Sequence, residues 1–298
     1  MKTKLTLLAL AFTTLAMQAQ TTFRPQLREG DVFTYTSEAT MKMNMPQAGM
    51  NVQDMHMSCD QRYTVKTVNK DSAIIETVVT RMDMPKEMTA TGSEPFSESF
   101  GNIQSLGKTP VLMSVNLDGT PRHVLNISEI KTKMSEYLNS LKKDNDGQEA
   151  AEGITNYVCN DSTILAAIDQ SGLFKYFGKL LKTGDTDKFN VMGIKAKRAY
   201  TVSDDGKRID VTYSPDMTTD DVKQMLLTQL KAAGQEEAAT QIEAGWPQMV
   251  AMGLANVEMS GTESMTFGDK GWPQHINSDM KTNMFGMEMT ITSKATLK

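Results

Sequence analysis

One long alternating stretch near the N-terminus constrains the fold more than any other feature of the chain. From Phe33 to Met45, every second residue is apolar or small, and the residues between them are mostly polar or charged. This period of two is typical of a β-strand with one buried face. A Pro-Gln-Ala-Gly turn follows at 46–49, and the alternation resumes from Met55 to Val65. The pattern predicts a long antiparallel hairpin whose inner face is lined mainly by methionine.

Further strands are predicted on both sides of a helical middle. Strand patterns cover 72–84, 111–127 around an Asp-Gly turn, 189–213 and 257–297. A helical period covers parts of 128–182, including an apolar run over 161–181, and of 218–245. We therefore predict an α+β fold, with a curved antiparallel sheet or half-barrel and three to four helices packed on it. One β-rich domain would span 20–298, with helical insertions at about 128–182 and 218–245.

The first nineteen residues have the pattern of a secretory signal peptide. Lys2 and Lys4 precede an apolar run over Leu5–Met17, and small residues follow at Ala16 and Ala19. The apolar run is too short to be interpreted as a membrane span. We expect cleavage after Ala19, no transmembrane span in the mature chain, and export to the periplasm or the exterior of a Gram-negative bacterium.

The composition disfavours two classes of function. The formal net charge of −5 and the lack of a basic stripe argue against binding nucleic acid through its phosphates. Only three histidines occur, and no metal, nucleophile or phosphate-loop motif accompanies them. The sequence predicts no enzymatic activity and no cofactor.

The predicted binding surface is the methionine-rich face of the sheet. The chain contains 24 Met, and methionine is a flexible apolar residue that repacks around varied ligands. A final hairpin around 285–286 adds methionines to the same kind of face. We expect an apolar small molecule or lipid to be the partner, held by Phe33, Tyr35, Met41, Met43, Met45, Met55, Met57, Met284, Met287 and Met289.

A soft-metal site is the alternative to an apolar ligand. Thioether sulfur suits Cu(I) and Ag(I), and alternate residues of a strand present their sulfurs on one face. The candidate ligands are Met43, Met45, His56 and Met57, although His56 has the opposite parity to Met57. A structural or partner-binding role in the cell envelope is a third interpretation.

Cysteines and two short triplets complete the candidate sites. Cys59 and Cys159 form an even pair in a chain expected in an oxidising compartment, so either a disulfide or two free thiols fits the sequence. Asp-Ser-Ala at 71–73 and Asp-Ser-Thr at 161–163 resemble acceptor triplets of Gram-negative O-glycosylation, which would make Ser72 and Ser162 exposed.

The order of these features resembles a known kind of exported protein. The stretch Leu27-Arg28-Glu29-Gly30-Asp31-Val32-Phe33-Thr34-Tyr35, the Asp-Gly hairpin at 118–119 and Gly-Trp-Pro at 271–273 resemble a family of exported bacterial proteins of unknown function. That family is built on a curved antiparallel sheet. A more distant likeness is to LolA-like and LppX-like periplasmic lipid carriers, in which a half-open barrel lidded by helices holds acyl chains. The resemblance implies a non-enzymatic carrier-like protein.

Overall fold

One large antiparallel sheet organises the fold. The computed structural model describes residues 20–45, 50–51, 54–83, 109–140, 159–170, 173–191, 194–232, 236–255, 257–284 and 287–298. The predicted signal peptide over 1–19 lies outside these residues. Twelve strands of this part of the chain belong to the sheet, and all of their pairings are antiparallel. The predicted curved antiparallel sheet is therefore confirmed, and the sheet is open rather than a closed barrel.

The strand order joins the two ends of the chain in the middle of the sheet. Eleven strands follow one another as β7-β6-β5-β4-β2-β14-β13-β12-β11-β10-β9, and β3 pairs beside β2. Their bounds are β2 (Val32–Met45), β3 (Met50–Asn51), β4 (Met55–Val68), β5 (Ser72–Asp83), β6 (Val111–Asn116), β7 (Pro121–Val124), β9 (Thr186–Val191), β10 (Ile194–Val202), β11 (Arg208–Pro215), β12 (Val257–Phe267), β13 (Pro273–Met284) and β14 (Met287–Leu297).

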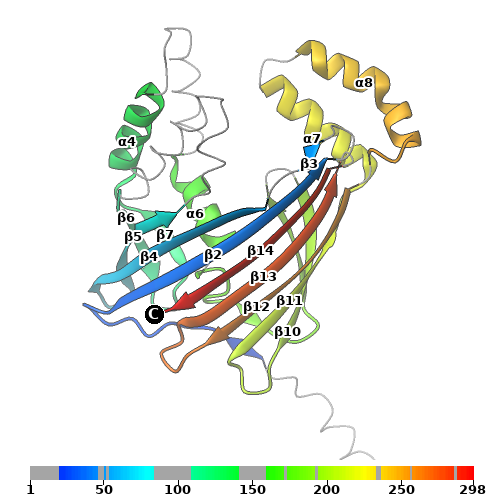
Figure 1. Ribbon diagram of the computed structural model, residues 1–298. Helices are drawn as coiled ribbons and strands as arrows, with labels where there is room; N and C mark the ends of the chain where they lie inside the picture. The colour runs from blue at the N-terminus through cyan, green and yellow to red at the C-terminus, as the bar shows by residue number, and fades with distance from the viewer. Residues whose placement is uncertain are drawn as a thin grey trace, which may run out of the picture.

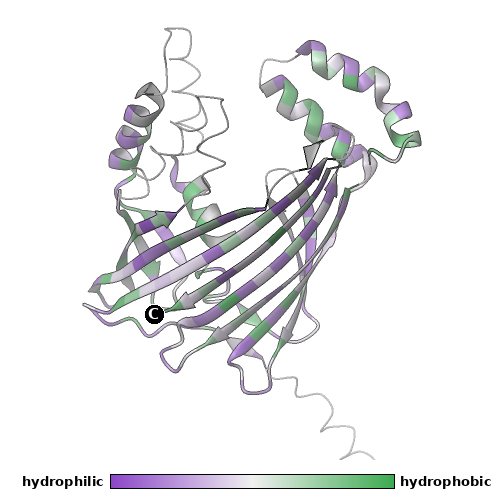
Figure 2. Ribbon diagram, in the orientation of Figure 1, coloured by the Kyte–Doolittle hydropathy of each residue, from purple (hydrophilic) through white to green (hydrophobic). Residues whose placement is uncertain are grey.

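The two edges of the sheet curve toward the same side, so the sheet has a concave and a convex face (Figure 1). Strands β5–β7 continue the sheet on one side of the central strands, and β9–β11 continue it on the other. Bands of opposite hydropathy alternate along the strands (Figure 2), as a period of two requires. Phe33, Tyr35, Tyr63 and Val65 point to the concave side, where the main core lies.

The described part of the chain contains four helices, α4 (Ile127–Ser140), α6 (Asp161–Gln170), α7 (Thr219–Ala232) and α8 (Glu236–Ala251). Helix α6 packs against the main core through Leu165 and Ile168. Helices α4, α7 and α8 stand beyond the ends of the strands (Figure 1). Helices α7 and α8 share a small core of their own around Val222 and Trp246. The number of helices agrees with the prediction, but these three helices lie at the rim rather than on the sheet.

A non-helical segment fills one end of the concave side. Residues 173–181, called the plug below, follow α6 as turns and end in β8 (Leu180–Leu181), which pairs with β1 (Thr21–Thr22). The predicted helix over 161–181 is therefore wrong from Leu173 onward. The first five plug residues, 173–177, are all buried, so this part of the segment has no polar face to present to solvent. Its apolar spacing reflects burial on all sides, and an amphipathic helix needs one polar side.

Aromatic rings fix the plug against the sheet. Trp272, at the start of β13, is 1% exposed and stacks on Phe33 with ring centroids 4.2 Å apart. The rings of Phe174 and Phe177 meet Trp272 edge-on at 6.2 and 5.8 Å. Such edge-to-face pairs add stability beyond their buried area. Gly271 makes this arrangement possible, because its φ is +72° and an added Cβ would lie 1.9 Å from the carbonyl oxygen of Arg24.

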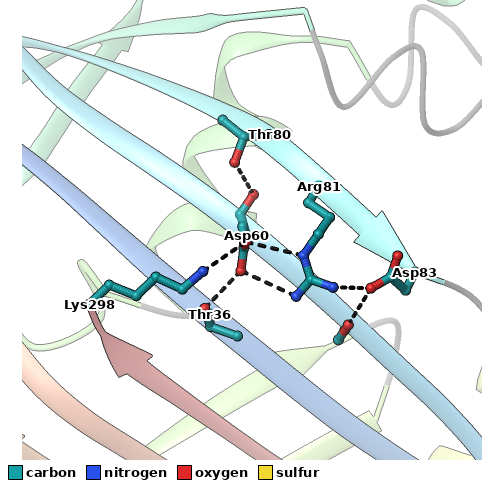
Figure 3. A network of polar contacts seen from close by, with 7 residues as sticks. Thr36, Asp60, Thr80, Arg81, Asp83 and Lys298 are labelled. Carbon is teal, nitrogen blue, oxygen red and sulfur yellow. Dashed lines mark hydrogen bonds and ion pairs between the residues drawn. The ribbon is translucent and has the colours of Figure 1, made fainter.

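A polar network on the convex side ties the end of the chain to β4 and β5 (Figure 3). The Asp60 carboxylate accepts hydrogen bonds from Arg81 Nε at 3.1 Å, Lys298 Nζ at 2.9 Å and Thr36 Oγ1 at 2.7 Å. These donors, Arg81 first, hold the pKa of Asp60 well below its usual range. Arg81 also pairs with Asp83. The network lies beside a β-bulge between β4 and β5 at Asp60 and connects four strands.

Candidate functional site

The register of the central strands brings small residues together on the concave face. Glu263 of β12 pairs with Ser278 of β13, which pairs with Ser293 of β14, followed by Ala39 of β2 and Met57 of β4. These five residues share one face because they are directly opposite one another. At about 4.8 Å per strand, this row is about 19 Å long. It defines the central line of the candidate site.

Two neighbouring rows widen this line into a strip. On the side nearer the plug, the row runs Met265, Ile276, Ala295, Ser37 and Cys59. On the other side it runs Gly261, Met280, Ile291, Met41 and Met55. We call Ser278, Ser293, Ala39, Ala295 and Ser37 the small-residue strip.

The small-residue strip is only half buried, although the residues on the plug side of it are fully buried. Phe33 and Tyr35 of β2 are 6% and 2% exposed, whereas Ser37, Ala39 and Met41 farther along the same strand are of intermediate exposure. The strip has side chains of one or two heavy atoms, and bulky side chains flank it. The surface is therefore low along this line, where serine hydroxyls alternate with alanine methyl groups.

Met280 forms part of the border of the strip. A Cβ added at Gly261 would lie 2.2 Å from the Met280 sulfur, so this thioether lies directly over the glycine. Met280 is half buried and packs against the main core. Because the side chain of methionine has three rotatable bonds, the border can adapt to what lies on the strip.

A surface depression of about 560 Å³ lies beyond this border, at the α7–α8 end of three strands. Met259, Thr282 and Met289 have the inward parity, and the six lining residues of opposite parity on β12, β13 and β14 are all charged or polar. The full lining is Pro215, Glu258, Met259, Ser260, Lys281, Thr282, Asn283, Glu288, Met289 and Thr290. The inward members extend the apolar surface of the strip toward the rim.

A buried polar cluster adjoins the other end of the strip. Lys175 of the plug donates to Glu263 Oε2 at 2.6 Å and to the Tyr213 hydroxyl at 2.6 Å. The hydroxyls of Tyr176 and Tyr213 donate to Glu263 Oε1 and Oε2 at 2.6 and 3.1 Å. The side chains of Lys175 and Glu263 are 8% and 9% exposed. We call these four residues the Lys175–Glu263 cluster.

Burial dominates the electrostatics of this cluster. It lowers the pKa of Lys175, and the Glu263 carboxylate opposes that shift. Burial and the nearby Glu263 charge raise the pKa of Tyr176 and of Tyr213, which keeps both hydroxyls protonated as donors. Beside the cluster, the buried Arg198 makes two hydrogen bonds at 2.8 and 2.7 Å to Asp187, whose side chain is 42% exposed. Each charge in the region is therefore matched by an opposite one.

The sequence analysis did not single out this cluster, although two signals were present. Glu263 occupies an inward position of β12, between Gly261 and Met265, where an apolar or small residue is the rule. Lys175 stands alone within an aromatic run. A charged residue at a buried position needs a partner, and the fold brings these two together across 88 residues of sequence.

The predicted ligand residues fall into three groups. Met41, Met55, Met57 and Met289 lie on the strip side of the sheet and are half buried. Phe33 and Tyr35 pack in the main core and are separate from the half-buried methionines. For the remaining four, the structure describes the backbone, which lies in the expected strands, and not the side chain. These residues are Met43, Met45, Met284 and Met287.

Of the alternative metal ligands, only His56 and Met57 have described side chains, and these two side chains lie on opposite faces of β4. His56 is exposed, and its Nδ1 lies 2.9 Å from Thr40 Oγ1 on the convex side, away from Met57. Within the described ranges, no cluster of three or more His, Cys, Asp or Glu residues is placed to hold a metal ion.

The cysteines and serines named in the sequence analysis lie at separate places along the chain, in or next to β4, β5 and α6. Cys59 and Cys159 are free thiols, so the disulfide that the sequence left open is not formed. Burial raises the pKa of both thiols. Ser162 is exposed in the first turn of α6, and its hydroxyl donates to Asn160 at 2.6 Å. Ser72 is the half-buried first residue of β5.

Comparison with known proteins gives little further guidance. No protein-family model and no curated protein matches the sequence. A solved structure concerning lipid–protein interactions in lipovitellin aligns with 91% of this chain at 12% identity and a TM-score of 0.40. This chain spans about a quarter of that lipovitellin chain, since the alignment covers 25% of it. A likeness this weak supports no argument about ligand or function. In the described part of the chain, no helix is long and apolar enough to cross a membrane.

Proposed function

We propose that this chain is an exported, non-enzymatic binding protein that holds an apolar or lipidic molecule along the small-residue strip. The observation that carries the proposal is the half-buried line of small side chains, bordered by methionines, on the concave face, next to a fully packed core on the same strands. Export rests on the pattern of the first nineteen residues.

The shape and chemistry of the strip suit a long, thin ligand. Its central row is about 19 Å long from the spacing of strands, which matches an extended long acyl chain. Side chains with few atoms lie along the middle, and Met41, Met57, Met280 and Ile291 lie around it. Covering this surface would remove apolar area from water, which is favourable. The flexible thioethers would adjust to the ligand.

The test uses neighbouring residues on opposite faces of β2. Ala39→Phe places a ring on the strip, whereas Glu38→Phe places the same ring on the exposed convex side. We expect Ala39→Phe to lower the affinity for a polarity-sensitive fluorescent fatty-acid analogue at least tenfold. Glu38→Phe should bind as the wild type does. Equal binding by all three proteins, with unchanged circular dichroism, would show that the strip is not the ligand site.

A soft-metal site is the second candidate. Met55, Met57 and Cys59 occupy successive inward positions of β4 and are all half buried, and their sulfurs suit Cu(I). Anaerobic Cu(I) titration with a competing chelator would detect such a site. A Met55→Leu/Met57→Leu variant that loses stoichiometric Cu(I) binding would support this function, and a wild type that binds no Cu(I) would exclude it.

A further inference from the structure

We infer that the thiol of Cys59 and the thioethers of Met82 and Met57 form a binding site for one soft monovalent cation, Cu(I) or Ag(I), on the concave side of β4 and β5. This inference rests on the second candidate function, soft-metal binding. It adds a ligand from β5 that the sequence pattern did not indicate, and it makes the thiol the principal ligand. It does not depend on an apolar molecule lying on the small-residue strip.

A β-bulge brings Met82 opposite Cys59. The register of β4 with β5 shifts between Asp60 and Gln61, and Thr80 is the extra residue of β5. Before the bulge, β5 turns its odd-numbered residues inward, since 73, 75 and 77 are buried. After the bulge, the even-numbered Met82 pairs directly with Cys59. Bulges re-aim side chains in this way, and here the result is a thioether facing a thiol.

The neighbours of Met82 agree with this direction. Arg81 and Asp83 are exposed and belong to the polar network on the convex side, whereas Met82 between them is half buried. Cys59 and Met57 are half buried on the inward face of β4. Three sulfur-bearing side chains therefore lie on one face of two adjacent strands, and their half exposure leaves them accessible to an ion from solvent.

The spacing of these side chains allows the sulfurs to share one ion. Metal–sulfur bonds are about 2.3 Å long, as in zinc thiolates, so two sulfurs on one ion lie within about 4.6 Å of each other. Directly opposite residues of an antiparallel pair have Cβ atoms about 5 Å apart, which lets Cys59 and Met82 meet this limit. Met57 is two residues from Cys59, about 6.8 Å along the strand. Its three rotatable side-chain bonds can bring a third sulfur to the same ion.

The charge of the site favours a monovalent ion. The described inward neighbours of the sulfurs carry no charge; they are Ser37, Ala39, Gln61 and Val79. One thiolate and Cu(I) form a neutral unit, since thioethers are uncharged, whereas a divalent ion would leave a net positive charge in a half-buried place. Such a charge is costly to bury. Thiolate and thioether ligands also select Cu(I) by their softness.

Binding exchanges the thiol proton for the ion. Burial raises the pKa of Cys59, and a hydrogen bond with Ser37 opposes that shift. The charges of Asp60 and Arg81 act on the thiol with opposite signs, and the nearby Tyr63 hydroxyl is kept protonated by its own burial. The thiol is therefore protonated at neutral pH, and Cu(I) replaces one proton on its sulfur. The affinity should rise about tenfold per pH unit over this range.

The experiment is an anaerobic Cu(I) titration of the full mature protein in competition with bicinchoninate. At pH 7.5 we expect one tightly bound Cu(I) per chain, about tenfold weaker binding at pH 6.5, and no displacement by a tenfold excess of Zn(II). Cys59→Ser should lower the affinity at least a hundredfold, and Met82→Leu about tenfold. The matched controls are Cys159→Ser, which removes the other thiol, and Met259→Leu on β12, four strands away from β4. Both controls should bind as the wild type does.

The outcomes separate this site from the broader functions. A wild type that binds no Cu(I) would overturn the inference together with the second candidate function. Wild-type affinity in Cys59→Ser and Met82→Leu, with loss in Met55→Leu/Met57→Leu, would overturn the ligand set and keep that function. Weaker binding in Cys159→Ser would also overturn the ligand set. Circular dichroism checks folding, and the volume-conserving Met82→Leu provides the test if Cys59→Ser is unfolded. Titration with the fatty-acid analogue stays a separate test of the strip.

Discussion

The two ends of the concave face are built from the same strands and yet differ in packing. At the plug end, Phe33 of β2, Val65 of β4 and Met265 of β12 are almost completely buried. At the opposite end of these strands, Met41, Met57 and Met259 are half buried. Aromatic rings and an inserted segment fill the first end. Small residues and methionine characterise the second.

Under the proposed function, one sheet provides both stability and a binding surface. Close packing at the plug end supplies the stabilising contacts. The other end does not need to be filled in order for the chain to fold, so its side chains can be chosen for a ligand. The account therefore predicts large stability effects at the plug end and small ones along the strip.

The largest effect is expected for Phe177→Ala. Phe177 is 1% exposed, and its ring contacts those of Phe174, Phe267 and Trp272. Removing a buried ring leaves a cavity and should lower the free energy of unfolding by about 3–5 kcal/mol. Urea denaturation followed by circular dichroism measures this loss. A loss as small as that of Met41→Ala, on the strip side of β2, would contradict the difference between the two ends.

Breaking the Lys175–Glu263 cluster should have the next largest effect. Lys175→Met leaves a buried carboxylate without its cation, at a cost of about 3 kcal/mol. The double variant Lys175→Met/Glu263→Gln removes both charges, and the new amide has an oxygen that accepts from one tyrosine hydroxyl and an N–H₂ group that donates to the other. It should be more stable than Lys175→Met alone. A double-mutant cycle by urea denaturation tests this, and additive losses would show that the two residues are not coupled.

The convex network gives a smaller, pH-dependent contribution. Because the pKa of Asp60 is lowered in the folded protein, its pairing stabilises the fold above the unfolded pKa of about 4. This contribution is lost as the pH falls from about 4 through the lower folded pKa. Thermal unfolding temperatures of the wild type and Asp60→Asn should therefore converge as the pH is lowered from 5 toward 2. A constant difference between them over this range would show that Asp60 is not the titrating group.

The smallest effect on stability is expected along the strip. Met41→Leu/Met57→Leu conserves volume at half-buried positions and should change the free energy of unfolding by less than about 1 kcal/mol. Equilibrium denaturation is again the measurement. A loss above about 2 kcal/mol would mean that these methionines are core residues, and that the strip side is packed like the plug end.

Much of the sheet was predictable because its strands alternate strictly. The hairpin of β2 and β4, the Asp-Gly turn before β7 and the final strands all show this pattern. The plug was not predictable, because a segment buried on all sides has no polar face and its spacing fits a helix equally well. Gly-Trp-Pro-Gln shows the same limit. It lies within α8 at 245–248 and at the start of β13 at 271–274, so tertiary contacts decide its structure.

The candidate site was predictable only in part. Alternation put Met41 and Met57 on the inward face, but it could not tell which inward residues another segment would cover. Phe33 and Tyr35 have the same parity as Met41, and only the plug and Trp272 distinguish them. The small-residue strip depends on the register between β2 and β14. In chain order, these are the first and the last strand of the sheet. That pairing has no local signal in the sequence.

The most direct test of the central claim is native mass spectrometry of the mature protein, purified gently from its own cell envelope. Wild type and Ala39→Phe are compared side by side. The account predicts an added mass in the lipid range on the wild type, released on collisional activation, and a bare protein mass for Ala39→Phe. A bare wild type, or an equal added mass on both proteins, would contradict the claim that the strip holds an apolar ligand.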